Sequence, residues 1–444
     1  MTDAPSWWWA DLGGLPAPRP ALDGDREADV CIVGAGYTGL WTAYELLRAD
    51  PSLAVVLLER EVAGFGASGR NGGWVLGEVS TGSRQREAAG EAAVAALERA
   101  IQATVDEVGD ACAREGIDCD FVKGGSLTVA QTEPQLARLH DAPRGALLDV
   151  DEAAARVRVA GLRGARYTPH CARVQPAKLV RGLAAAVERR GGTIHEGTAA
   201  LDIAPRRVRT GSGTVRARWV VRATEGYTAG LPGLERALLP LSSSMIVTEP
   251  LDGATWAQIG WAGCETLDDA AHAYIYAQRT ADGRIAIGGR GRPYRFGSST
   301  DRAGEIPEAT VRQLRARLTR LFPILSDVRL DGAWTGVFGV ARDWAASVHC
   351  DRDSGLCWAG GYAGEGVAAA NLAARTLRDL ILDRDTELAR LPWVGHHARG
   401  WEPEPLRWLA VQTVYGAFRA ADALEDRTGR SSWLAGAAGA LAGR

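Results

Sequence analysis

Three glycines, Gly34, Gly36 and Gly39, stand in the spacing G-x-G-x-x-G, and the acidic residue Glu59 follows twenty positions after the last of them. The first glycine allows a sharp turn, the second lets the backbone approach a pyrophosphate, and the third lets a helix press against a sheet. Amides at the start of that helix favour a bound phosphate, and the carboxylate can accept both ribose hydroxyls. This set predicts a dinucleotide-binding site.

The residues around the glycines supply the elements that such a site needs. Residues 29–33 predict a strand that ends at the first glycine, and apolar residues at 40, 43, 44 and 47 recur at the spacing of a helix. The unbroken apolar run 55–58 is typical of a strand buried on both faces, and Glu59 ends it. The order strand, turn, helix, strand therefore places all four residues at one edge of a parallel sheet.

The composition describes an ordinary globular protein. Its 444 residues are 46% hydrophobic and 24% charged, and 51 basic against 54 acidic residues leave a formal net charge of -3. The length allows two domains, and the charge balance favours neither nucleic acid nor an anionic membrane as a partner. We find no apolar run long enough for a membrane span and no signal-peptide pattern, so we expect a cytoplasmic protein.

The cysteines and histidines suggest no catalytic or metal centre. Seven cysteines are scattered without a C-x-x-C pair, so we expect reduced thiols and no metal site. His170, His272 and His349 lie near predicted strand ends. We interpret each as a structural histidine.

A second glycine-rich loop spans Gly64 to Trp74 and reads G-F-G-A-S-G-R-N-G-G-W. Its backbone can lie against a ligand, while Ser68, Arg70 and Asn71 offer hydrogen-bond donors. Together with the first motif and Glu59, this loop resembles the corresponding segments of the flavoprotein superfamily of D-amino-acid oxidase, glycine oxidase and sarcosine oxidase. The residue order G-A-S-G-R-N-G-G is closest to that of the gamma-glutamylputrescine-oxidase-like branch. The resemblance implies FAD as the cofactor.

The fold that the resemblance implies is α/β, with a discontinuous Rossmann-like FAD-binding domain of the glutathione-reductase type and a second, mixed β-sheet domain for the substrate. The FAD domain would comprise residues 26–80, 171–229 and 336–388. The substrate domain would comprise 81–170 and 230–335, followed by a helical tail at 389–444. From the pattern alone, residues 84–116 predict one long helix on the surface of the second domain.

The same resemblance implies a set of FAD-binding residues from four parts of the chain. They are Gly34, Gly36, Tyr37, Thr38, Gly39, Glu59 and Arg60; Gly66, Ala67, Ser68, Arg70, Asn71, Gly72, Gly73 and Trp74; Ala199, Ala223, Thr224 and Gly226; and Gly361, Tyr362, Gly364, Glu365, Gly366 and Val367. The last group follows a predicted strand and leads into a predicted helix. The positive N-terminal end of that helix would face the flavin ring in its reduced state.

Four aromatic residues are candidates for the catalytic pocket: Tyr274, Tyr276, Trp344 and Tyr362. The two nearby tyrosines alternate along a predicted strand and share one face, as core residues or as a wall beside the flavin. Amino-acid oxidases of this superfamily have an arginine that binds the substrate carboxylate, at the position where this chain has Phe338. A substitute for that arginine could come from Arg290, Arg292 or Arg342. No cysteine occurs from 265 to 349, so we expect noncovalent FAD.

The leading hypothesis is an amine oxidase that converts the C–H beside an amine nitrogen to an imine, with O2 as electron acceptor and H2O2 as product. A polyamine-derived amine is one possible substrate. The alternatives are a tailoring oxidase or dehydrogenase with a bulkier substrate, and a non-catalytic flavin-binding subunit.

The two ends of the chain are rich in tryptophan. Trp7, Trp8 and Trp9 are expected to pack an N-terminal arm over an apolar groove, with a substrate mouth or partner surface as the alternative. The tail is expected to pack near the active-site entrance or at an interface of a homo-oligomer.

Overall fold

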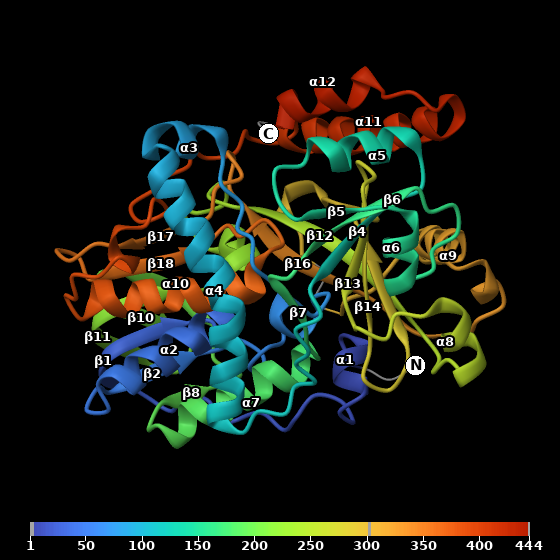
Figure 1. Cartoon of the computed structure of the whole chain (residues 1–444). Helices are drawn as coiled ribbons and strands as arrows, with labels where there is room; N and C mark the ends of the chain where they lie inside the picture. Colours follow the sequence, from blue (N-terminus) through green and yellow to red (C-terminus); the bar gives the residue numbers. More distant parts are fainter. Residues whose placement is uncertain (1–3, 301–302, 443–444) are drawn as a thin grey trace.

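The computed structural model describes residues 4–300 and 303–442, so the last two residues of the predicted tail lie outside it. The chain forms two large sheets placed side by side (Figure 1), and this confirms the predicted α/β class with a mixed second sheet. Within the described residues no helix is long and apolar enough to cross a membrane.

The first sheet draws its strands from three separate parts of the chain. Its order is β17-β18-β11-β1-β2-β8, with β9 and β10 attached to β11. The strands are β1 (Arg26–Val33), β2 (Val55–Leu58), β8 (Thr193–His195), β9 (Ala200–Ala204), β10 (Arg207–Thr210), β11 (Thr214–Arg222), β17 (Ser347–Cys350) and β18 (Leu356–Gly360). The pairs β1·β2, β1·β11, β2·β8 and β11·β18 are parallel.

Side chains of β1 alternate between the two faces of this sheet, as the pleat requires. Val30 and Ile32 join the core beneath the helices, whereas Cys31 and Val33 face the smaller cluster covered by β9 and β10. The helices of the first face are α2 (Tyr37–Ala49), α4 (Glu91–Glu115), α7 (Pro176–Arg189) and α10 (Gly366–Ile381). This packing fixes the carboxyl edge of β1 and β2, where the glycine motif lies.

The long helix predicted for 84–116 is instead two helices, α3 (Ser83–Ala89) and α4. Gly90 separates them because its φ of +79° is a left-handed conformation that no helix continues through. The buried residues of α4 pack against α7 and α10, two helices that cover the first sheet (Figure 1). The helix therefore does not lie on the surface of the second domain, where it was predicted.

The second sheet is antiparallel except for the parallel pair β13·β4. Its order is β16 (Leu330–Val340), β12 (Leu239–Thr248), β15 (Ile285–Gly289), β14 (Ile275–Arg279), β13 (Thr266–Asp269), β4 (Ser126–Ala130), β6 (Gly164–Thr168) and β5 (Ala146–Leu148). One face packs on α6 (Val150–Arg156), α8 (Gly253–Ile259) and α9 (Glu308–Leu321). The opposite face carries Met245, Tyr276 and Trp334 toward the first sheet.

The smaller elements join these two bodies. The strands β3 (Trp74–Leu76) and β7 (Cys171–Arg173) pair with each other, and α5 (Glu133–Asp141) lies near the C-terminal helices α11 (Leu406–Thr428) and α12 (Trp433–Ala442) (Figure 1). Asp422 of α11 accepts the backbone amides of His272 and Ala273, both at 2.9 Å. His272 Nε2 also lies 3.0 Å from Glu425 Oε1, so its ring is tied to α11.

The N-terminal arm packs as the apolar alternative predicted. Trp8 and Trp9 of α1 (Trp7–Ala10) are buried, and the Trp8 ring lies 5.9 Å from that of Trp334 in an edge-on contact. Trp8 Nε1 donates to the carbonyl of Asn71 at 2.9 Å. The arm therefore supports the second glycine loop from outside.

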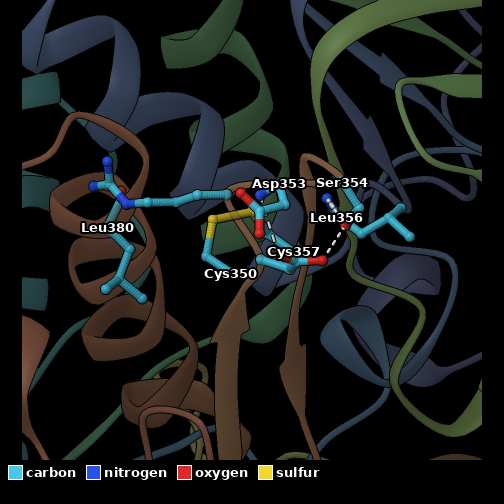
Figure 2. Close-up of a disulfide and its surroundings, with 8 residues drawn as sticks. Cys350, Asp353, Ser354, Leu356, Cys357 and Leu380 are labelled. Carbon is cyan, nitrogen blue, oxygen red and sulfur yellow. Dashed lines mark hydrogen bonds between the residues drawn. A yellow bond between two sulfur atoms is a disulfide. The ribbon is translucent and has the colours of Figure 1, made fainter.

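The expectation of seven reduced thiols is wrong for one pair, because a disulfide joins Cys350 and Cys357 (Figure 2). The two residues face each other directly in the antiparallel pair β17·β18, with Cα atoms 4.0 Å apart. A separation of seven residues gives no motif in the sequence, and only the hairpin register brings the sulfurs together. Within the described residues the other five cysteines are free.

Candidate functional site

The first glycine turn leaves the backbone exposed to the space above the sheet edge. Gly34 has a φ of +104°, and a Cβ there would lie 2.6 Å from the carbonyl oxygen of Ala223. A Cβ at Gly36 would lie 2.9 Å from Ser68 Oγ, the atom that accepts the amide of Tyr37 at 2.8 Å. The first two glycines therefore allow the turn to approach Ala223 and Ser68 more closely than a side chain would permit.

Gly39 acts one turn later and inside the protein. A Cβ at this position would lie 1.9 Å from the carbonyl oxygen of Gly34 and 3.2 Å from Ile32. The helix can approach β1 this closely only without a side chain here. Gly39 is therefore a packing residue and not a part of the cavity wall.

Glu59 follows the end of β2 and is held from both sides. Its Oε2 accepts the amide of Ala35 at 2.9 Å, and its Oε1 accepts the amide of Glu61 at 3.0 Å. Burial is the main cause that raises the pKa of Glu59 to about 7, against the opposing effect of the Ala35 amide. The carboxyl group faces the cavity with a fixed orientation.

The second glycine loop is tied to itself and to the second sheet. Asn71 Nδ2 donates to the carbonyls of Ala67 and Ser68 at 3.1 and 2.9 Å, and Asn71 Oδ1 accepts the amide of Gly73 at 2.7 Å. The Arg70 guanidinium donates to the carbonyl of Phe65 at 2.8 Å and stacks over the Phe65 ring. Both polar side chains thus shape the loop.

A cavity of about 1060 Å³ runs between the two sheets and contacts both glycine loops. The predicted site residues that line it are Gly34, Gly36, Tyr37, Thr38, Glu59, Arg60, Gly66, Ala67, Ser68, Arg70, Asn71, Gly72, Trp74, Ala199, Ala223, Thr224, Tyr274, Tyr276, Trp344, Tyr362, Gly364, Glu365, Gly366 and Val367. Gly39, Gly73, Gly226 and Gly361 do not line it. Residues more than 300 positions apart in the sequence therefore face one space.

Aromatic side chains form the far wall of the cavity. Tyr276 packs edge-on against Trp74 at 6.3 Å, and its hydroxyl lies 2.8 Å from Ser243 Oγ. Tyr362 is buried, and its hydroxyl lies 3.2 Å from Thr38 Oγ1. Trp344 Nε1 donates to the carbonyl of Ala442 at 3.0 Å, so the C-terminal helix reaches this wall. Polar partners thus fix the orientation of these three rings.

Glu225 holds the turn between β18 and α10 in place. Its Oε1 accepts the amide of Tyr362 at 3.2 Å, and its Oε2 accepts the amide of Gly339 at 2.9 Å. Burial is the main cause that raises the pKa of Glu225 to about 7. The start of α10, with its positive helix end, is thereby fixed against the cavity.

Among the three arginines considered as carboxylate partners, Arg290 is the one that lines the cavity. It donates to the Tyr274 hydroxyl at 2.8 Å and stacks over Phe338 at 4.7 Å. Arg342 pairs with Glu402 at 3.0 Å, and Arg292 is exposed. Phe338 itself lies in the wall, so this position supplies an apolar ring.

The site has the features that a dinucleotide requires. It combines a glycine turn at a helix start, an oriented carboxylate at the end of β2, and a volume of about 1060 Å³, slightly above the range of roughly 300–1,000 Å³ that ligand pockets occupy. The family model described as "FAD dependent oxidoreductase" matches residues 29–380. The chain belongs to this FAD-dependent oxidoreductase family. The predicted superfamily and the predicted class of enzyme are confirmed.

Two relatives are similar to this chain over most of its length and over most of their own. The gamma-glutamylputrescine oxidoreductase of Escherichia coli (strain K12) is 30% identical over 414 residues, which are 88% of this chain and 93% of that protein. A probable oxidoreductase, OrdL, of Rhizobium meliloti (strain 1021) is 30% identical over 405 residues, with 86% and 89% covered.

Solved structures share the fold at lower identity. Glycine oxidase from Geobacillus kaustophilus has a TM-score of 0.68 at 22% identity and covers 84% of this chain and 99% of that one. Fructosyl amine: oxygen oxidoreductase (Amadoriase I) from Aspergillus fumigatus has a TM-score of 0.65 at 16% identity, with 84% and 89% covered.

Several cavity residues were missed by sequence reasoning. Glu78, Ser243 and Asp268 line the wall, as does Glu225. Glu225 lies between Thr224 and Gly226, which were both predicted to bind FAD, so its position was a usable signal. The other three have no local motif: strand register brings Ser243 and Asp268 to the cavity, and Glu78 reaches it from the loop after β3.

Proposed function

We propose that this FAD-dependent oxidoreductase is an amine oxidase with noncovalently bound FAD. The observation that carries the proposal is the continuous cavity, which joins the dinucleotide-type loops to an aromatic wall that has Phe338 where related amino-acid oxidases place an arginine. Bound FAD would accept a hydride equivalent from the C–H beside the amine nitrogen and pass the electrons to O2, giving H2O2. The substrate imine would then hydrolyse to a carbonyl compound and an amine.

The residues around the cavity have distinct proposed roles. The amides at the start of α2 and the Glu59 carboxylate would bind the pyrophosphate and the ribose. The second glycine loop and the start of α10 would contact the flavin ring, whose reduced form is favoured by the positive helix end. Tyr276 and Tyr362, each oriented through its hydroxyl, would position the amine against the ring.

The proposed division of the chain follows from the same arrangement. The parts 26–80, 171–229 and 336–388 would form the FAD domain, because they contain the strands of the first sheet. The parts 81–170 and 230–335 would form the substrate domain, except that α4 packs on the helices of the first sheet and that β16 continues the second sheet to Val340. The similarity to a gamma-glutamylputrescine oxidoreductase supports a polyamine-derived amine as the substrate.

The test is an anaerobic visible spectrum of the purified, FAD-loaded protein before and after addition of gamma-glutamylputrescine, 1,4-diaminobutane, sarcosine, glycine and D-alanine. Bleaching of the flavin band by an amine, followed by H2O2 release when air is admitted, is the expected result. A flavin that bleaches but returns its electrons only to an artificial acceptor would indicate a dehydrogenase. A flavin that no amine reduces would contradict the proposal.

A further inference from the structure

One carboxylate in the cavity wall is only partly satisfied by the protein, since the Thr128 hydroxyl is the side-chain hydrogen-bond partner of Asp268. Asp268 lies on β13 and lines the cavity, and its Oδ1 atom is shielded from solvent without a hydrogen-bond partner. A buried acceptor left unpaired costs free energy, and a buried charge costs more, so such a group in a ligand cavity points to a ligand that pairs with it. Its neighbour Asp269 is satisfied differently, since it accepts the amide of Ile275 at 3.0 Å.

Strand register places Asp268 beside the aromatic wall. Asp268 is directly opposite Tyr276 in the antiparallel pair β13·β14, so both side chains leave the sheet on the face toward the cavity. The Tyr276 hydroxyl is occupied by Ser243 at 2.8 Å, and so the tyrosine presents its ring. A carboxylate beside an aromatic face is a favourable environment for an ammonium group.

The arginines in this part of the wall do not neutralise Asp268. Arg86 contacts Glu98 at 3.5 Å, Arg138 pairs with Glu425 at 2.9 Å, and Arg290 donates to Tyr274 at 2.8 Å. A second carboxylate, that of Glu78, also lines the cavity and lies 3.9 Å from Arg144. Asp269 and Glu78 thus have arginine partners, Arg317 at 3.6 Å and Arg144 at 3.9 Å, whereas none of the arginines named here pairs with Asp268.

The raised pKa of Asp268 follows from its burial without a cationic partner, and it leaves the carboxyl mostly protonated at neutral pH until a cation binds. Burial is the main cause that raises its pKa to about 8, the hydroxyl of Thr128 opposes the shift, and the charges of Asp269 and Glu78 add to it. An ammonium group beside the carboxyl would favour the ionised form and supply the missing hydrogen-bond donors.

We propose that Asp268 binds a positively charged group of the substrate, remote from the nitrogen whose C–H is oxidised. The inference rests on the proposed amine oxidase function and deepens it, because it names the substrate class. The enzyme would select amines that carry a second cationic centre, such as diamines and amines with an ammonium group at the far end. Asp268 is thus assigned to specificity, and the oxidised nitrogen does not contact it.

The test compares the FAD-loaded wild type with Asp268→Asn, which keeps the shape of the side chain and removes its charge. The substrates are 1,4-diaminobutane and 1-aminobutane, which have the same chain length and differ in the second ammonium. We expect kcat/KM for the diamine to fall about 10- to 100-fold, since a hydrogen bond to a charged group is worth about 1.5–3 kcal/mol and 1.4 kcal/mol is tenfold. The value for the monoamine should change less than about threefold.

Two further variants control the experiment. Asp141→Asn makes the same chemical change at an exposed position on α5 and should leave both substrates unaffected. Asp268→Glu keeps the charge and should retain the preference for the diamine. Melting temperatures of all variants establish that they are folded.

A binding measurement separates this inference from the proposed function. tert-Butylammonium keeps its charge and its N–H donors but has no C–H beside the nitrogen and cannot form an imine, so calorimetry with the FAD-loaded protein reports cation binding without turnover. We expect binding by the wild type and a loss of about 10-fold or more in Asp268→Asn, even if neither amine is oxidised. Equal binding by the two proteins, or an equal loss of kcat/KM for diamine and monoamine, would overturn the inference.

Discussion

Replacing Glu59 with glutamine should weaken FAD binding, and the structure gives the size of the effect. Both carboxylate oxygens already accept backbone amides, from Ala35 at 2.9 Å and from Glu61 at 3.0 Å. A carboxamide has one acceptor oxygen, so its NH2 group would face one of these amides and lose that bond. Charge-assisted bonds to ribose hydroxyls would weaken as well. At about 1.5–3 kcal/mol for a bond to a charged group, FAD affinity should fall about 10- to 100-fold.

The pH dependence gives this prediction a second, independent readout. Burial raises the pKa of Glu59 to about 7, so below this pH the free protein holds a proton that opposes donation by the ribose hydroxyls. Wild-type affinity for FAD should therefore decrease as the pH falls from 8 to 6, by up to about tenfold per unit below the pKa. The glutamine variant cannot titrate and should lose this part of the dependence.

The assay is reconstitution of the apoprotein with FAD, followed by quenching of flavin fluorescence at pH 6, 7 and 8. Glu27→Gln serves as the matched control, because Glu27 is exposed at the far end of β1. Equal dissociation constants for the wild type and Glu59→Gln at pH 8, or the same slope with pH, would refute the assigned role of the carboxylate.

Three further outcomes are expected. Gly39→Ala should lower the free energy of unfolding by at least about 2 kcal/mol in urea melts, because a Cβ would lie 1.9 Å from the carbonyl oxygen of Gly34, whereas Gly416→Ala, with nothing within 4 Å, should not destabilise. Trp9→Ala removes a fully buried ring and should cost about 3–5 kcal/mol by the same measurement; Trp433→Ala, 76% exposed, should stay within about 0.5 kcal/mol. Acid precipitation of the holoenzyme should release all of its flavin into the supernatant, and colour retained by the pellet would contradict noncovalent binding.

The nucleotide-binding half of the site was predictable because its signals are local. The turn at Gly34, the helix that starts beyond Gly36 and the carboxylate of Glu59 lie within one short unit whose spacing carries its own physical reason. The strand β18, the glycine turn after it and the helix α10 were predictable for the same reason. These elements form where the sequence pattern places them.

The substrate half depends on pairings that no local pattern encodes. Asp268 reaches the cavity because β13 pairs with β14 in one register, and a shift of one residue would turn it away. The sequence analysis also missed the break at Gly90 and the disulfide between Cys350 and Cys357. A glycine in an otherwise helical pattern is often tolerated, and two cysteines seven residues apart meet only in a hairpin.

The N-terminal arm packs against a part of the chain that is distant in sequence. Trp8 rests against Trp334 and donates to Asn71, while Gln175 donates to the carbonyl of Trp8 at 2.8 Å. Trp334 follows Trp8 by more than 300 positions, so a growing chain leaves the three adjacent indole rings without this part of their binding site until residue 334 has been made. The arm therefore docks fully only after that point, and the second glycine loop gains its outer support only then.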